Sequence, residues 1–124
     1  MIRKHLLCPE RVRKIPKQFS WIDQRLVRDG HIGCVSHRAA ALYLFLVTVA
    51  DARGLSYYSD AAVCRRLAMD ESCLADARRE LVQTGLLAYG PPLYQVLDLE
   101  KEAAPAAPGL YSLQEIFKQM GGRR

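Results

Sequence analysis

The sequence has no apolar run long enough to cross a lipid bilayer. Its longest such run, residues 39–50, lies between Arg38 and Asp51, whereas a membrane-spanning helix needs about 20 apolar residues. The basic N-terminus also lacks the apolar stretch and the small-residue cleavage site of a secretory signal. These absences argue against a membrane partner, and they predict a soluble protein of the cytoplasm.

Motifs of catalysis and cofactor binding are missing as well. The sequence contains no glycine-rich phosphate loop, no nucleophile elbow and no His-Glu pair of the metalloprotease type, each of which has a recognisable spacing. We therefore predict a protein that is not an enzyme and carries no cofactor.

The cysteines do not form closely spaced pairs. Cys8, Cys34, Cys64 and Cys73 are scattered along the chain, without the short spacing of metal or redox motifs. We expect free thiols that are buried or half-buried, as is common in a reducing compartment.

One short stretch holds side chains that suit zinc, namely His31, Cys34 and His37. Structural zinc usually has four ligands, and the fourth would have to come from His5, Cys8 or an acid elsewhere. A zinc-dependent enzyme or sensor is therefore a third hypothesis for the chain. Our main prediction for the functional site includes no metal.

Positive charge is in excess, with 18 Lys and Arg against 13 Asp and Glu. Residues 1–20 hold six basic side chains and one acid, whereas residues 21–99 hold eight arginines and nine acids. A basic arm suits a polyanion, because each phosphate that Lys or Arg neutralises releases condensed counterions. Residues 1–18 are therefore either a nucleic-acid-binding arm or a solvated leader that aids solubility. The candidate contacts of this arm are Arg11, Arg13, Lys14 and Lys17.

Hydrophobic spacing predicts one domain over residues 19–99. Residues 19–27 fit either a short strand or a helical turn, since both spacings occur there. Ser36 is then expected to cap a helix from His37 to about Asp51, with Gly54 at its C-cap. This helix is expected to be apolar on most of its circumference and to be the central buried helix. Its apolar residues are Ala40, Leu44 and Val47 with the neighbouring Ala41, Leu42 and Phe45.

Two further helices are expected beyond an extended link over residues 55–59. Ser59 or Asp60 caps the shorter one, and Asp70 caps a longer one that runs to Thr84. Gly85 follows at a position that requires a left-handed residue. The inward side chains of the two helices are Val63, Cys64 and Leu67 in the first and Leu74, Ala77 and Leu81 in the second. Two such helices joined by about four residues form a helix-turn-helix.

The spacing of hydrophobic residues changes after these helices from a helical pattern to that of strands. Residues 86–89 and 93–99 flank Gly90-Pro91-Pro92, which is a hairpin signal with a proline-stiffened tip. We expect two antiparallel strands here.

The end of the chain reads as a linker and an amphipathic helix. Residues 100–109 are rich in alanine and proline, which favours an extended linker, and Ser112 with Glu115 forms a capping box at the start of residues 110–124. The helix is too short to be stable alone, so it must dock on this domain, on a second copy to form a homodimer, or on another protein. Its apolar stripe, the candidate partner-binding surface, is Leu113, Ile116, Phe117 and Met120.

This order of elements resembles the winged helix-turn-helix domains of bacterial regulators. It is also similar to the N-terminal module of plasmid replication-initiation and primosome-type proteins, and to small proteins of this type on mobile elements. The residues that carry the resemblance are Ala41-Leu-Tyr-Leu-Phe-Leu, Tyr58-Ser-Asp and Ala77-Arg-Arg-Glu-Leu-Val-Gln-Thr-Gly-Leu-Leu. The resemblance covers residues 19–99 and implies an α+β, mainly helical fold, followed by the C-terminal amphipathic helix.

The resemblance implies a role in binding double-stranded DNA, in transcription regulation or as a replication or mobile-element accessory factor. The third helix would enter the major groove, where Arg79 suits guanine and Gln83 suits adenine. Arg65 and Arg66 would grip phosphates. The full outward set of the third helix is Ser72, Ala75, Asp76, Arg79 and Gln83. The alternative is that Arg79 and Glu80 only solvate a surface helix.

Two features depart from the family pattern. Arg78 stands where such domains usually bury a leucine, so either its stem packs inward with the guanidinium escaping, or the helix is rotated. Asp70, Glu71 and Asp76 also make the third helix acidic, which opposes phosphate at its start. A protein-interaction or dimerisation module that does not bind DNA is therefore the alternative function.

Overall fold

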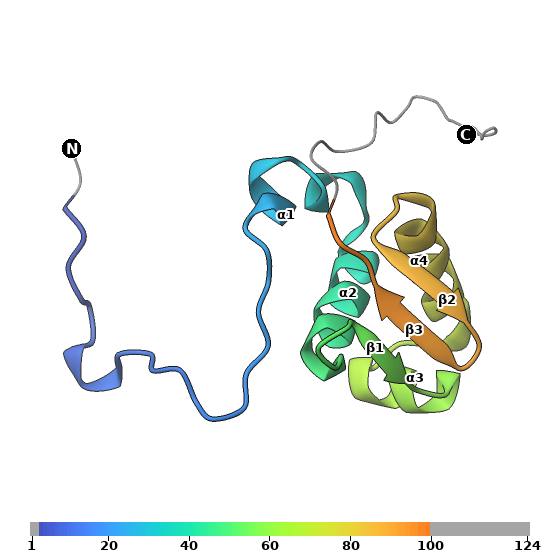
Figure 1. Ribbon diagram of the computed structural model, residues 1–124, viewed down its shortest axis with the longest axis horizontal. Helices are drawn as coiled ribbons and strands as arrows, with labels where there is room; N and C mark the ends of the chain where they lie inside the picture. The colour runs from blue at the N-terminus through green and yellow to red at the C-terminus, as the bar shows by residue number, and fades with distance from the viewer. Residues whose placement is uncertain (1–2, 100–124) are drawn as a thin grey trace.

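Residues 3–99 are described by the structure, a computed structural model of the chain. Within this range the fold is α+β and mainly helical, as predicted (Figure 1). The elements are α1 (Arg25–Arg28), α2 (His37–Val49), β1 (Leu55–Tyr57), α3 (Asp60–Leu67), α4 (Glu71–Gln83), β2 (Leu87–Gly90) and β3 (Leu93–Val96), with 3₁₀ turns at Pro9–Arg11 and Ile32–Cys34. The linker and C-terminal helix predicted over residues 100–124, including Leu113, Ile116, Phe117 and Met120, lie outside the described residues. No helix among the described residues has the length and apolarity needed to cross a membrane.

Short polar side chains begin the three longer helices. The side chains of Ser36, Ser59 and Asp70 each accept a hydrogen bond from the backbone N–H three residues ahead. These bonds satisfy donors that the first turn of a helix leaves unpaired. The predicted starts of all three helices are thus confirmed, and Ser59 rather than Asp60 caps α3.

The buried face of α2 differs from the prediction. The buried residues are Ala39, Leu42, Tyr43 and Leu46. Leu42 was among the apolar residues predicted, but so was Leu44, which is 55% exposed. Because this helix is apolar around most of its circumference, hydrophobic spacing did not define which stripe faces the core.

The predicted C-cap role of Gly54 is wrong, because α2 ends at Val49 and Ala50 is already extended. Gly54 instead lies in the turn before β1, with a φ of +87°. A Cβ atom there would stand 2.5 Å from the carbonyl oxygen of Val96, and the Val96 N–H donates to the Gly54 carbonyl over 2.8 Å. Glycine is needed here both for its backbone conformation and for this close approach.

The sheet is antiparallel and has the order β1-β3-β2. The hairpin of β2 and β3 confirms the prediction, with Leu87 opposite Val96 and Gly90 opposite Leu93. We expected residues 55–59 to form an extended link without strand partners. Their first three residues instead form strand β1, which pairs with the other edge of β3. Strand pairing far along the chain has no local sequence signal, and for that reason β1 was not predicted as a strand.

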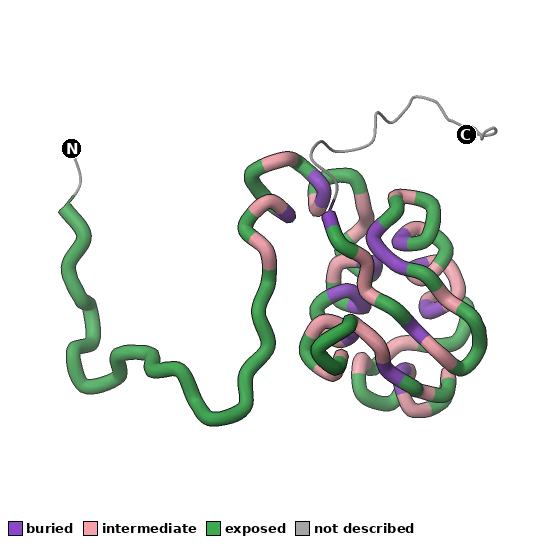
Figure 2. The backbone as a smooth tube through the Cα atoms, viewed as in Figure 1, coloured by how far each residue is buried: buried purple, intermediate pink, exposed green. Residues whose placement is uncertain are grey.

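One hydrophobic core joins the helices to the sheet (Figure 2). Helix α4 packs against α2, α3 and β2, and its predicted inner residues Leu74, Ala77 and Leu81 are fully buried. The remaining buried core residues are Leu26, Ala39, Leu42, Tyr43, Leu46, Val63, Leu86, Leu87, Tyr94 and Leu99. The burial of these three inner residues leaves the opposite side of α4 facing outward.

The N-terminal arm is exposed throughout residues 3–20 and runs away from the folded part (Figures 1 and 2). Of the ambiguous stretch over residues 19–27, only the end is helical, in α1, and residues 19–23 form neither a helix nor a strand. Leu26 packs into the core, while Ile22 remains 47% exposed.

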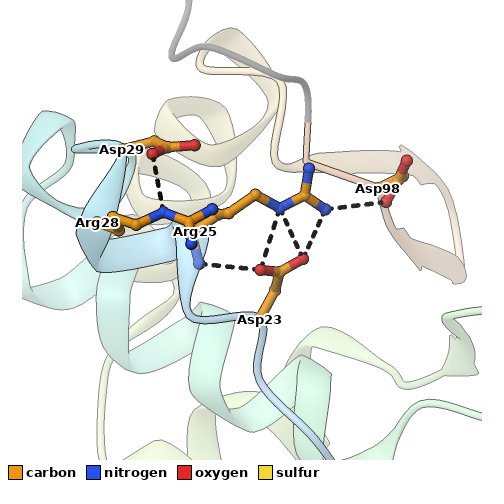
Figure 3. Close-up of polar contacts among 5 residues, drawn as sticks. All are labelled: Asp23, Arg25, Arg28, Asp29 and Asp98. Carbon is orange, nitrogen blue, oxygen red and sulfur yellow. Dashed lines mark hydrogen bonds and ion pairs between the residues drawn. The ribbon is translucent and has the colours of Figure 1, made fainter.

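A polar network holds α1 beside the end of β3 (Figure 3). The Asp23 carboxylate accepts hydrogen bonds from the backbone N–H of Arg25 at 2.9 Å and from its guanidinium at 2.7 Å. The same guanidinium lies 3.9 Å from the Asp98 carboxylate. The hydrogen bonds from Arg25 lower the pKa of Asp23 from 3.8 to about 2.

Candidate nucleic-acid interface

A left-handed residue makes the tight turn between α3 and α4. Ala68 has a φ of 53°, and the N–H of Met69 returns to the carbonyl of Cys64 over 3.1 Å. A non-glycine residue adopts this conformation only at a cost in free energy. The turn sets α4 against α3 in the helix-turn-helix order that the sequence predicted.

The outer side of α4 carries most of the residues assigned to it. Ser72, Arg79 and Gln83 are exposed, whereas Ala75 and Asp76 are half-buried. These two positions lie nearer the flank of the helix than the prediction placed them.

Arg79 is engaged by a carboxylate of its own helix. Its guanidinium donates to Asp76 over 3.0 Å, and Arg38 from α2 reaches the same carboxylate at 3.9 Å. The sequence did not predict that Arg38 reaches this surface, because Arg38 lies on another helix. Arg79 of α4 and Arg38 of α2 therefore share the Asp76 carboxylate, which partly balances their charge within the protein.

Glu80 joins α4 to the start of α2. Its carboxylate accepts hydrogen bonds from the backbone N–H and the hydroxyl of Ser36, both at 2.8 Å. The alternative in which Glu80 only solvates the helix is wrong, because this carboxylate completes the capping of α2. The contact spans 44 positions of the chain, so no local pattern indicated it.

Arg78 packs inward but its guanidinium does not escape to solvent. Only 15% of its side chain is exposed, and the guanidinium donates to Asp60 over 3.0 Å and to the Tyr94 hydroxyl over 2.9 Å. It also lies 4.2 Å from the centre of the Tyr89 ring, within range of a cation–π interaction. Of the two arrangements expected for Arg78, the stem packs inward as in the first, but the guanidinium makes part-buried polar contacts instead of reaching solvent.

Burial and hydrogen bonding shift the pKa values of Arg78 and of its partner Tyr94. Burial lowers the pKa of the guanidinium, but the hydrogen bonds with Asp60 and Tyr94 outweigh it and leave the pKa raised. Burial raises the pKa of the Tyr94 hydroxyl, although the bond from Arg78 opposes that rise. Arg78 thus stays charged and is committed to the interior, so we exclude it from the candidate contacts.

Arg65 and Arg66 are exposed in the last turn of α3. Neither forms an ion pair with a carboxylate of residues 3–99. The arm residues Arg11, Arg13, Lys14 and Lys17 are likewise exposed and make no such pair within that range. These cations are available to an external anion without first breaking an internal contact.

The side chains considered for zinc do not form a ligand set. His31 is buried, and its Nε2 atom has no hydrogen-bond partner among the described residues. Cys34 and His37 are exposed, and the Cys34 thiol donates to the Gly30 carbonyl over 3.4 Å. Within residues 3–99, no three His, Cys, Asp or Glu side chains gather as a metal site would require.

The four cysteines are free thiols, as expected. Cys64 and Cys73 are half-buried, but Cys8 and Cys34 are exposed. The expectation of burial was therefore wrong for these two, which lie in an exposed arm and an exposed turn.

Comparison with protein-family models, with curated proteins and with solved structures found no match to this chain. The arrangement of its own residues is therefore the basis for assigning a function.

Proposed function

We propose that this chain binds double-stranded DNA as a winged helix-turn-helix protein. In this proposal α4 enters the major groove and the β2–β3 hairpin is the wing. The family resemblance depends on a capped helix, a link, a short helix, a longer helix and a hairpin, and the chain has α2, β1, α3, α4 and the β2–β3 hairpin in these places. The biological role would be transcription regulation or an accessory function in replication or in a mobile element.

The observation that carries the proposal is the outer side of α4. Leu74, Ala77 and Leu81 are fully buried, so the opposite side, with Arg79 and Gln83, is free to meet a base edge. Arginine pairs with guanine and glutamine with adenine through two hydrogen bonds each. To reach a base, Arg79 would have to break its hydrogen bond with Asp76. Guanine offers two acceptors in exchange, so the contact would favour guanine over the other bases.

Phosphate contacts would come from cations that need no such exchange. Arg65 and Arg66 lie at the end of α3, the helix that crosses the DNA backbone in this class of domain. The arm adds Arg11, Arg13 and Lys14, with Lys17 nearer the domain. Such contacts position a protein on the duplex, and they make its affinity depend on salt.

Fluorescence anisotropy of a labelled mixed-sequence duplex, measured at several salt concentrations with the full chain, tests this function. We expect binding that weakens as salt rises. The double variant Arg65→Ala/Arg66→Ala should bind more weakly and lower the slope of log K against log salt by roughly 0.9 for each lost phosphate contact.

Arg28→Ala is a control for the loss of one arginine from the domain surface, to be compared with Arg65→Ala and Arg66→Ala made singly. Arg28 is 66% exposed on α1, and α1 lies at the far end of the domain from α3 (Figure 1). The control should bind DNA as the wild-type chain does. Absence of binding at low salt, or an equal loss in the control, would overturn the proposal.

A protein-interaction module is the second candidate, and the acidic flank of α4 favours it. Asp76 and Glu80 accompany Arg79 on this helix and pair with Arg38 at 3.9 and 4.0 Å. Negative charge beside the helix opposes an approaching phosphate. If the anisotropy experiment detects no binding at any salt concentration, this second function becomes the one to pursue.

A further inference from the structure

A groove of about 520 Å³ lies away from the proposed DNA-binding helix. Phe19, Trp21 and Ile22 line it from the segment before α1, and Val47 from α2 and Leu97 after β3 line it from the domain. The groove is therefore formed where the start and the end of the folded part meet.

Large apolar side chains are left unusually open to water in this groove. Trp21 is 72% exposed, Phe19 is 63% exposed and Ile22 is 47% exposed. Adjacent apolar side chains at a protein surface mark a place where another segment packs. Their neighbour Val47 continues the apolar surface into the domain.

The charges at the groove leave a small negative excess. Asp23, Asp51 and Asp98 line it together with Arg53, and Arg25 pairs with Asp23 and lies 3.9 Å from Asp98. Residues 110–124 carry the opposite balance, since Lys118, Arg123 and Arg124 accompany a single acid, Glu115. The groove and this segment are thus complementary in charge as well as in apolar character.

The chain itself brings the segment to the groove. Leu99, the last described residue, is 5% exposed and lines the groove. Residues 100–109 can span at most about 35 Å when fully extended, which is ample for residues 110–124 to return. A short tether of this kind gives a local concentration in the millimolar range, which favours the same chain over a second copy.

We infer that residues 110–124 dock into this groove of their own domain as an amphipathic helix. The apolar stripe of Leu113, Ile116, Phe117 and Met120 would cover Phe19, Trp21 and Ile22. This inference concerns a different surface from the DNA interface and does not depend on DNA binding.

Trp21 is the single tryptophan of the chain, so its fluorescence reports on the groove directly. The test compares acrylamide quenching of the full chain with the full-length variants Ile116→Asp and Gln119→Asp, without DNA. Gln119→Asp is the matched control, because it adds the same charge beside the stripe rather than in it. We expect Ile116→Asp to raise the quenching constant about twofold, since undocking returns apolar surface to water, and Gln119→Asp to leave it near the wild-type value.

Light scattering over a range of protein concentrations separates docking within one chain from docking between two. A monomeric mass with protected Trp21 supports the inference. Protection that appears only as the mass doubles would show that a second copy fills the groove, and it would overturn docking within the chain. Equal quenching in the wild-type chain and both variants would also overturn it. Circular dichroism of each variant verifies that the described domain remains folded.

Discussion

The guanidinium of Arg78 donates a hydrogen bond to the carboxylate of Asp60 over 3.0 Å, which joins the middle of α4 to the first residue of α3. The same guanidinium donates to the hydroxyl of Tyr94 in β3. One side chain thus connects the two helices and the hairpin of the proposed DNA-binding surface. Because Arg78 is largely buried, salt screens this connection less than it screens an exposed ion pair.

Replacing Arg78 with methionine should destabilise the protein although it adds apolar surface. The change leaves the buried Tyr94 hydroxyl without its partner, and an unsatisfied buried polar group costs about 1–3 kcal/mol. The Asp60 carboxylate also loses its partner, but its side chain is 42% exposed and can bind water instead. We expect a loss of about 2 kcal/mol in the free energy of unfolding, measured by urea denaturation. Arg79→Met is the control and should cost less than about 1 kcal/mol, because Arg79 makes an exposed pair. Equal losses in the two variants would show that the buried contacts of Arg78 contribute nothing specific.

Asp23 should make stability fall in acid. Its pKa is about 2 in the folded protein, against an ordinary value of 3.8. A carboxyl group with a lowered folded pKa stabilises the protein above its unfolded pKa, and this contribution disappears as the pH falls through the folded pKa. Wild-type protein should therefore be more stable than Asp23→Asn at pH 5, and the difference should shrink as the pH falls and vanish below the folded pKa of about 2.

Direct titration provides a second measurement of the same group. The carboxyl carbon of Asp23, followed by NMR, should titrate with a midpoint near 2. A midpoint close to 3.8, or a stability difference that does not change with pH, would contradict the role assigned to Arg25.

The sequence predicted the features that depend on neighbouring residues. Ser36 and Asp70 were recognisable as helix caps because a cap bonds to a backbone group only three residues away. Gly85 was recognisable for the same reason, and its φ of +81° confirms the prediction. Local bonds of this kind leave a pattern in the sequence that can be read without the fold.

Contacts between distant elements were not predictable in this way. The bonds of Glu80 to Ser36 and of Arg78 to Tyr94 arise only when the helices and hairpin are assembled. The buried stripe of α2 was missed for a related reason, because its apolar residues surround the helix. The assignment of Arg79 and Gln83 to DNA rests on the outward side of α4 and stays a prediction.

Substituting alanine at Gly54 should be far more damaging than the same change at Gly30. Both glycines have a positive φ, but only at Gly54 would the new Cβ meet another atom, the Val96 oxygen at 2.5 Å. We expect Gly54→Ala to cost about 3 kcal/mol, from the left-handed backbone and the displaced strand together. Gly30→Ala, with nothing within 4 Å, should cost only about 1–2 kcal/mol. Thermal unfolding of the two variants provides the comparison, and similar melting temperatures would contradict the close approach of Gly54 to β3.

Asp76→Asn should strengthen DNA binding if α4 contacts the duplex. The Asp76 carboxylate accepts a hydrogen bond from Arg79 over 3.0 Å, so it competes with DNA for that guanidinium and also repels phosphate. Because an exposed ion pair contributes at most about 1 kcal/mol, its removal should raise the affinity up to about fivefold. Asp29→Asn removes the same charge outside α4, from a carboxylate that pairs with Arg28 rather than with Arg79, and should change the affinity much less. Anisotropy titrations of both variants at one salt concentration decide the matter, and a weaker or unchanged affinity for Asp76→Asn would place the DNA contact elsewhere than at Arg79.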